Sequence, residues 1–186
     1  MPCTLLARAA LATVAFTLPA AYANAQEFKT KFSGFNEVGA LNAETGAILS
    51  DGTATLTLKV DKAASTATYS LTFSGLSAPV TQAHIHFGKV HVPGGVIVFL
   101  CTNLNNGPAG TQLCPAGGGT VTGTLMAGSV VGPAAQNILA GDFDGLTDAL
   151  ESNTAYGNIH TTKFPAGEIR GQLRRDRDKD DDDDHH

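Results

Sequence analysis

The sequence has 186 residues, of which 12 are Lys or Arg and 17 are Asp or Glu, giving a formal net charge of −5 at pH 7. This acidic balance, with no basic patch and no Trp, lacks the features that bring proteins to nucleic acids. The length allows one domain with a substantial hydrophobic core, flanked by terminal segments.

The first 25 residues have the pattern of an export signal. Arg8 supplies a short positive segment, and residues 9–21 then carry no charge over 13 positions. That run is shorter than the roughly 20 residues that a membrane-spanning helix needs. Two A-x-A patterns follow, and we favour cleavage after Ala25. We expect residues 1–25 to be a signal peptide, with an uncleaved anchor as the alternative, and the mature chain to be periplasmic or extracellular with no membrane span.

The body of the chain, residues 26–173, has the period of β-strands. Apolar residues alternate with polar ones in 54–60 and in 68–73, and the polar segment 61–66 between them predicts a hairpin. Further strands are predicted for the segments GVIVFL, TVTGTL and EIRGQL, at 95–100, 120–125 and 168–173. Short strands separated by Gly-, Asn- and Pro-rich turns indicate an all-β sandwich or barrel.

Four histidines lie in this body, and three of them fall within eight residues. His84 and His86 are two apart in AHIHFG, so on a strand both rings project from the same face. His91 follows in a loop, and His160 lies far along the chain in NIHT. Neutral imidazoles bind copper, zinc, iron and nickel. The four residues are candidate ligands of one metal ion, and hydrogen bonding within a half-buried sheet is the alternative.

Two cysteines remain in the body, Cys101 and Cys114, and they enclose a loop of 12 residues rich in Asn, Gly and Pro. An even number of cysteines in an exported chain favours a disulfide bond. Two thiolate metal ligands are the alternative.

One helical stretch is predicted near residues 142–153, where Leu146, Ala149 and Leu150 have helical spacing. Asp142 or Asp144 can cap its amino end. The aspartates of this segment do not match a calcium-binding EF-hand loop.

Motifs for nucleophilic or nucleotide chemistry are absent from the sequence, which contains no G-x-S-x-G elbow and no P-loop. Glu168 and Arg170 alternate with Ile169, so we expect them on the face opposite to it, as an ion pair or as braces of a turn.

Residues 174–186 contain no apolar side chain and end in five Asp and two His. Such a segment cannot bury enough surface to offset the entropy of ordering it, so we expect a disordered tail.

Taken together, these segments are identified as those of a CHRD domain, a family found widely in secreted bacterial proteins. FSGFNEV resembles the opening strand of the family, AHIHFG with GGVIVFLC resembles its centre, and YGNIHT with FPAGEIRGQL resembles its end, in the family's order over 28–173. The family usually has prolines after the opening Glu, where this chain has VGALN, and His91 is an additional histidine. The resemblance implies an immunoglobulin-like β-sandwich and little about activity.

A weaker similarity is to the copper ligand layout of Cu,Zn superoxide dismutase, another β-sandwich. The histidine spacing is similar, but the further His and Asp of a zinc site are missing. Our first hypothesis is therefore a secreted metal-binding module, with copper preferred over zinc because Cu²⁺ binds more tightly in the general affinity order. The alternatives are a non-catalytic adhesion or matrix module that contacts an extracellular protein or glycan, and a copper-dependent enzyme similar to superoxide dismutase.

Overall fold

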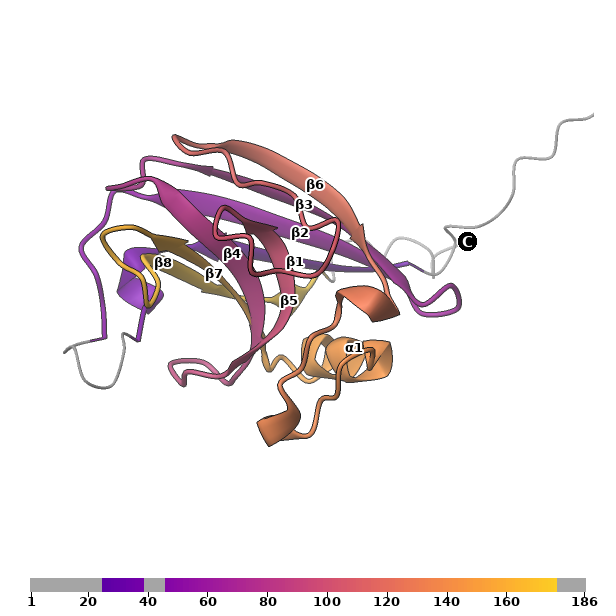
Figure 1. Ribbon diagram of the computed structural model, residues 1–186. Coiled ribbons are helices and arrows are strands. Elements are labelled where there is room, and N and C mark those ends of the chain that lie inside the picture. The colour runs from indigo at the N-terminus through magenta and orange to yellow at the C-terminus, as the bar shows by residue number, and fades with distance from the viewer. Residues whose placement is uncertain (1–24, 39–45, 177–186) are drawn as a thin grey trace, which may run out of the picture.

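The computed structural model describes residues 25–38 and 46–176, which form two packed antiparallel sheets (Figure 1). Sheet A has the strand order β6-β3-β2-β1-β9, and sheet B has the order β5-β4-β7-β8. The predicted all-β sandwich with one short helix is confirmed. The strands are β1 (Gln26–Phe32), β2 (Thr53–Asp61), β3 (Thr66–Ser74), β4 (Val80–Phe87), β5 (Gly95–Thr102), β6 (Gly119–Leu125), β7 (Ala155–Thr161), β8 (Ile169–Gln172) and β9 (Arg174–Arg175).

The predicted hairpin is formed by β2 and β3, and it supplies much of the core of sheet A. Leu56 pairs in register with Leu71, and Leu58 pairs with Tyr69. These four side chains are buried against sheet B, whereas the residues between them face solvent or are half-buried. The alternation of apolar and polar residues in these two strands therefore predicted correctly which face of the sheet packs on the core.

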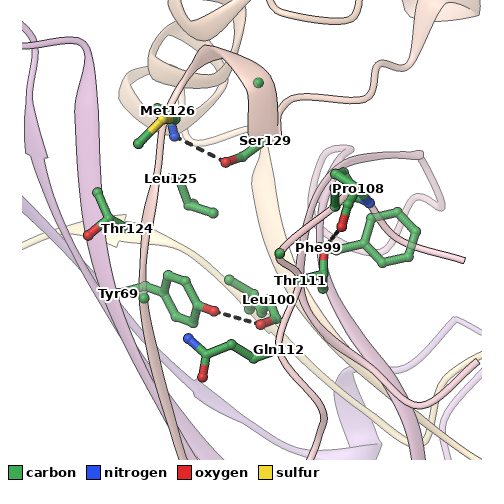
Figure 2. A pocket seen from close by; sticks show the side chains of 14 residues that line it. Tyr69, Phe99, Leu100, Pro108, Thr111, Gln112, Thr124, Leu125, Met126 and Ser129 are labelled. Carbon is green, nitrogen blue, oxygen red and sulfur yellow. Dashed lines mark hydrogen bonds between the residues drawn. The ribbon is translucent and has the colours of Figure 1, made fainter. Parts of the chain in front are cut away.

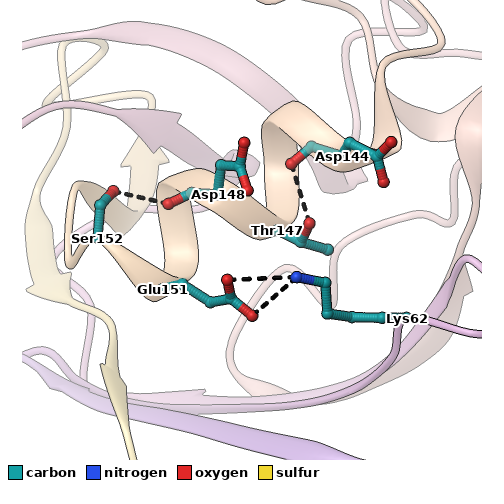
Figure 3. Close-up of polar contacts among 6 residues, drawn as sticks. All are labelled: Lys62, Asp144, Thr147, Asp148, Glu151 and Ser152. Atoms are coloured by element: carbon teal, nitrogen blue, oxygen red, sulfur yellow. Dashed lines mark hydrogen bonds and ion pairs between the residues drawn. The ribbon is translucent and has the colours of Figure 1, made fainter.

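The helix α1 (Phe143–Glu151) closes one end of the sandwich. Asp142 is its N-cap, since its side chain accepts a hydrogen bond of 2.8 Å from Gly145 N, while Asp144 lies in the first turn. Lys62, in the turn between β2 and β3, pairs with Glu151 at the other end of the helix (Figure 3). Three short 3-10 helices, Gly34–Asn36, Ala127–Ser129 and Ala134–Gln136, lie in the connections.

Sheet B differs from sheet A because both of its faces are buried. Every residue of β7 is buried, and so are Ile169, Arg170 and Gly171 of β8. One face packs on sheet A through Ala83, Ile85 and Ile159. The opposite face carries polar side chains. A strand predicted for 168–173 is present as β8. The alternation of apolar and polar residues there does not indicate an exposed face, because Arg170 is buried as well as Ile169.

The predicted signal peptide lies outside the described residues apart from Ala25, and the predicted tail lies outside them apart from 174–176. Arg174 and Arg175 form β9, which pairs with Lys29 and Phe28 of β1. Sheet A therefore continues two residues beyond residue 173, where the domain is predicted to end. No helix within 25–38 and 46–176 has the length and apolarity needed to cross a bilayer.

Gly157 allows β7 to pack closely on β1, and its replacement tests that contact. A Cβ atom at Gly157 would lie 2.2 Å from Phe32 Cζ. Gly157→Ala should therefore lower the free energy of unfolding by about 1–3 kcal/mol, measured by urea denaturation. Gly117→Ala is the matched control, because a Cβ there meets open space and should change stability by less than about 0.5 kcal/mol. Equal stabilities of the two variants would contradict the close packing.

Candidate metal centre

Strands β4 and β7 bring three histidines together on the polar face of sheet B. His84 and His86 are two apart on β4, and their rings lie 5.4 Å apart between centroids. His160 of β7 is paired in register with Gln82, two residues before His84. All three histidines are buried, with exposed fractions of 3%, 8% and 6%. The pairing of these neighbouring strands thus joins positions 76 residues apart in the chain.

Backbone carbonyl groups determine which nitrogen of two histidines carries the proton. His86 Nδ1 lies 2.9 Å from Gly94 O, and His160 Nδ1 lies 3.0 Å from Pro165 O. A carbonyl oxygen accepts but cannot donate, so each Nδ1 is the N–H donor. In a neutral ring the other nitrogen then has a free lone pair. The Nε2 atoms of His86 and His160 are therefore both unprotonated acceptors.

One of these lone pairs, that of His160, meets the third histidine. His84 Nδ1 lies 3.2 Å from His160 Nε2, and one nitrogen from each of the three residues lies within 4.8 Å of the others. Within the described residues, Nε2 of His84 and Nε2 of His86 are buried without a hydrogen-bond partner. Two imidazole nitrogens on one tetrahedral zinc, at about 2.0–2.1 Å each, would be about 3.3 Å apart. The donor set and its spacing are thus those of a site that can hold a metal ion.

His91, the fourth candidate ligand, is not brought to this cluster. It is exposed at a turn of the loop 88–94, where its φ of 60° is in the left-handed region. Arg170 fixes this loop, because its Nη2 donates to Lys89 O and Val92 O at 2.9 and 3.0 Å. The loop 88–94 contributes to the cluster through its backbone instead, because Gly94 O contacts His86 Nδ1.

Aromatic and cationic groups pack around the histidines. Tyr156 stacks on His86, with centroids 4.9 Å apart and an angle of 6° between the rings, and the Arg170 Cζ lies 3.4 Å from the centroid of Tyr156. Since β7 lies between β4 and β8, Tyr156 stands between His86 and Arg170. On the other side, the Phe99 ring packs edge-on against His84 at 4.3 Å.

Sequence reasoning missed the contributions of Tyr156 and Asn158. The signal was available, because alternate residues of YGNIHT share a face, and that face carries Tyr156, Asn158 and His160. Asn158 Nδ2 donates to Glu37 Oε2 at 2.6 Å and to Ile169 O at 2.9 Å. Burial raises the pKa of Glu37 despite the hydrogen bonds from Asn158 and Val38 that oppose it.

Glu168 and Arg170 have separate roles. The Glu168 carboxylate accepts hydrogen bonds from Ser50 Oγ, Ser77 N and Thr161 Oγ1 at 2.6–2.8 Å. Burial alone would raise the pKa of Glu168, but these three donors together lower it. Of the two expectations, bracing of turns is therefore correct, and in the described part of the chain no ion pair joins Glu168 to Arg170.

Burial keeps the histidines neutral. It lowers the pKa of His84 to about 2, with His160 and His86 adding to the effect. It lowers the pKa of His86 to about 4 and also lowers that of His160, in both cases against a carbonyl hydrogen bond that raises it. Neutral imidazole is the form that binds a metal.

The two body cysteines lie at the end of β5 and in the following loop. The sulfur atoms of Cys101 and Cys114 are 2.07 Å apart, the distance of a disulfide bond. Both residues are buried in the hydrophobic core rather than beside the histidines, so they are not thiolate ligands of this cluster.

Comparison with known proteins gives one match. The family model of the CHRD domain matches residues 28–173. No curated protein and no solved structure matches the chain.

The metal-free chain should lose stability as the pH falls below neutrality. The native state keeps His84 and His86 neutral at pKa values of about 2 and 4, whereas the unfolded chain protonates them near the usual value of about 6.5. The unfolded chain then binds more protons, so the free energy of unfolding decreases with falling pH by up to about 1.4 kcal/mol per unit for each residue.

Urea denaturation in a chelator between about pH 7 and pH 5 measures this slope. His84→Asn should reduce the slope, and His91→Ala, at an exposed position, should leave it unchanged. A slope that is the same in His84→Asn and in the parent chain would show that His84 is not held neutral by burial.

Proposed function

The chain belongs to the CHRD-domain family, and we propose that it is an exported metal-binding module in which His84, His86 and His160 hold a single copper ion. The proposal rests on one observation. Two backbone carbonyls hold Nδ1 of His86 and His160, which leaves Nε2 of both rings as lone-pair donors beside His84, with Nε2 of His160 3.2 Å from His84 Nδ1. Ligating histidines in metalloproteins are oriented in this way by partners on the other ring nitrogen.

The buried orphan atoms support a metal over a purely structural role. A buried polar atom without a partner costs about 1–3 kcal/mol, and this cluster contains two, Nε2 of His84 and Nε2 of His86. A structural set of histidines would be expected to satisfy its nitrogens among themselves. One ion bound between the rings would satisfy the lone pairs that the carbonyl contacts leave free.

Copper is the preferred metal because of the ligand chemistry. The cluster offers imidazole nitrogens only, since the nearest thiols are joined in a disulfide and no carboxylate belongs to the group. Imidazole sites bind copper and zinc, and Cu²⁺ exceeds Zn²⁺ in the general order of affinity. Zinc is the second choice for the same donor set.

The module would hold or deliver its ion outside the cytoplasm rather than catalyse a reaction. All three histidines are buried beneath loops, whereas a redox catalyst requires an open position that its substrate can reach. The bonded cysteine pair and the signal-like residues 1–25 support export, because disulfides persist in oxidising compartments. His91 is not part of the proposed ligand set.

Calorimetric titration of the apo protein with Cu(II) tests the ligand assignment. The parent chain should bind one ion tightly, and His84→Ala/His86→Ala should abolish this binding because two of three donors are lost. His91→Ala is the matched control and should bind as the parent does. Weak association at His185 and His186 is common to all three proteins and does not affect the comparison.

Both substitutions remove buried side chains, so folding of the double variant is checked by near-ultraviolet circular dichroism in chelator. If that variant does not fold, His86→Gln replaces it. The loss of one ligand should then reduce the affinity for Cu(II) by more than the roughly 10- to 100-fold that follows removal of a hydrogen-bonding partner behind a ligand. Equal affinity of the folded variant and the parent would exclude these residues as ligands.

Metal should also stabilise the native state by mass action. At a free metal concentration 100 times the dissociation constant, the free energy of unfolding should rise by about 2.7 kcal/mol. Thermal melts with Cu(II), Zn(II) and chelator measure this, and Cu(II) should give the larger increase. A melting temperature that does not change with either metal would contradict a site in the folded chain.

A further inference from the structure

The three-histidine cluster offers an ion few ligands, and all of them are uncharged. Among the residues that the structure describes, no Asp, Glu or Cys joins His84, His86 and His160 in a group that could hold a metal. Burial lowers the pKa of all three histidines, so the imidazoles are neutral near pH 7. An ion bound here therefore keeps its full charge, because no anionic ligand offsets it.

Other side chains that could bind a metal are engaged elsewhere. His91 is exposed and lies outside the cluster. The hydroxyl of Tyr156 accepts a hydrogen bond of 3.0 Å from Gly94 N, and the Glu37 carboxylate accepts one of 2.6 Å from Asn158. Cu(II) prefers square-planar or tetragonal sets of N and O ligands, and Zn(II) prefers four ligands in a tetrahedron. Cu(I) has a filled d shell and is stable with three ligands.

Uncharged rings close both sides of the cluster. Tyr156 stacks on His86 with centroids 4.9 Å apart, and Phe99 packs edge-on against His84 at 4.3 Å. Beyond Phe99 lies a cleft of about 390 Å³ between β5 and β6, and Figure 2 shows Phe99 beside the loop that carries Pro108. None of the 14 residues that line this cleft is charged. The cleft therefore supplies no carboxylate to an ion at His84.

A buried cation lies on the far side of Tyr156 from the cluster. Arg170 is 1% exposed, and its Cζ lies 3.4 Å from the centroid of the Tyr156 ring. Within the described residues, Arg170 forms no salt bridge and its buried Nη1 has no hydrogen-bond partner. Burial lowers the pKa of His86 to about 4, and the charges of His160 and Arg170 lower it further. The charge of Arg170 also opposes each positive charge on a bound ion.

We propose that the cluster selects copper as Cu(I), over Cu(II) and Zn(II). This inference rests on the proposed function, because it concerns the ion held by His84, His86 and His160. A buried neutral site penalises a dication more than a monocation, since the cost of leaving water grows with the square of the charge. A dication would also have to bring water as a fourth ligand. Thiolates are common ligands of Cu(I). Here the low number of ligands, their burial and the charge of Arg170 favour the same ion.

Competition titrations of the full-length chain at pH 7 compare the two oxidation states. Bathocuproine disulfonate competes for Cu(I) under anaerobic ascorbate, and nitrilotriacetate competes for Cu(II) in air. The cluster should bind Cu(I) at least about tenfold more tightly than Cu(II), because the dication loses more hydration. His84→Ala/His86→Ala measures the binding at Cys3, His185 and His186, which is common to both proteins and is subtracted.

Two substitutions separate the charge of Arg170 from its role in fixing the loop 88–94. Arg170→Gln and Arg170→Lys both remove the guanidinium that binds Lys89 O and Val92 O, but only lysine keeps the positive charge. Acting from about 10 Å at an effective dielectric constant of about 20, one charge changes the affinity for each further charge on the ion by about tenfold. The ratio of Cu(I) to Cu(II) affinity should therefore be about tenfold lower in Arg170→Gln than in Arg170→Lys.

The outcomes distinguish this inference from the proposed function. Cu(II) that binds the cluster as tightly as Cu(I), or more tightly, would overturn the preference for Cu(I) and leave a copper module. Equal ratios in folded Arg170→Gln and Arg170→Lys would overturn the role of the charge. If neither oxidation state binds the parent more tightly than it binds His84→Ala/His86→Ala, the proposed function itself fails. His86→Gln replaces the double variant if near-ultraviolet circular dichroism shows that the latter does not fold.

Discussion

The structure depends on a sheet whose second face is polar and yet buried. Sheet B packs one face on the apolar side chains of sheet A, and its other face carries histidines, Tyr156, Asn158 and Arg170. Buried polar groups require hydrogen-bond partners, and here the covering loops supply them from their backbones. Lys89 O and Val92 O hold Arg170, Gly94 O holds His86, and Pro165 O holds His160.

This arrangement leaves unsatisfied imidazole nitrogens within the histidine cluster. The carbonyl contacts take Nδ1 of His86 and His160. Nε2 of His160 then lies 3.2 Å from His84 Nδ1, while Nε2 of His84 and Nε2 of His86 have no hydrogen-bond partner within the described residues. Arg170 holds the loop 88–94, and Gly94 O of the same loop orients His86. Arg170 therefore also affects the histidine cluster indirectly, by fixing the position of this loop. Tyr156 stands between them and separates the guanidinium charge from the nearest imidazole. The result is a set of three neutral imidazoles, from His84, His86 and His160, held in place by the surrounding backbone and rings.

Local patterns in the sequence predicted the parts of the fold that local chemistry determines. The β2–β3 hairpin followed from alternation and a polar turn, and the shared face of His84 and His86 followed from their spacing on a strand. The sequence offered two caps for the helix, and Asp142 is the one that the structure uses. The burial of Glu168 and Arg170 could not be predicted in this way, because it depends on loops far away in the sequence that cover the sheet. The exposed position of His91 outside the cluster could not be predicted for the same reason, since its loop is held by Arg170, 79 positions further on. The pairing of Arg174 and Arg175 with the edge of β1 has no signal in the sequence, because both residues are charged and lie in a segment without apolar side chains.

The central claim is that carbonyl contacts leave Nε2 of both His86 and His160 unprotonated before any metal arrives. Nitrogen-15 NMR of the metal-free chain measures this directly, because protonated and unprotonated ring nitrogens resonate in separate regions. The account predicts that His86 and His160 each have a protonated Nδ1 and an unprotonated Nε2, and that Cu(I) or Zn(II) shifts both Nε2 signals. Protonated Nε2 atoms in either residue would contradict it, since a lone pair would then be absent where the metal is expected to bind.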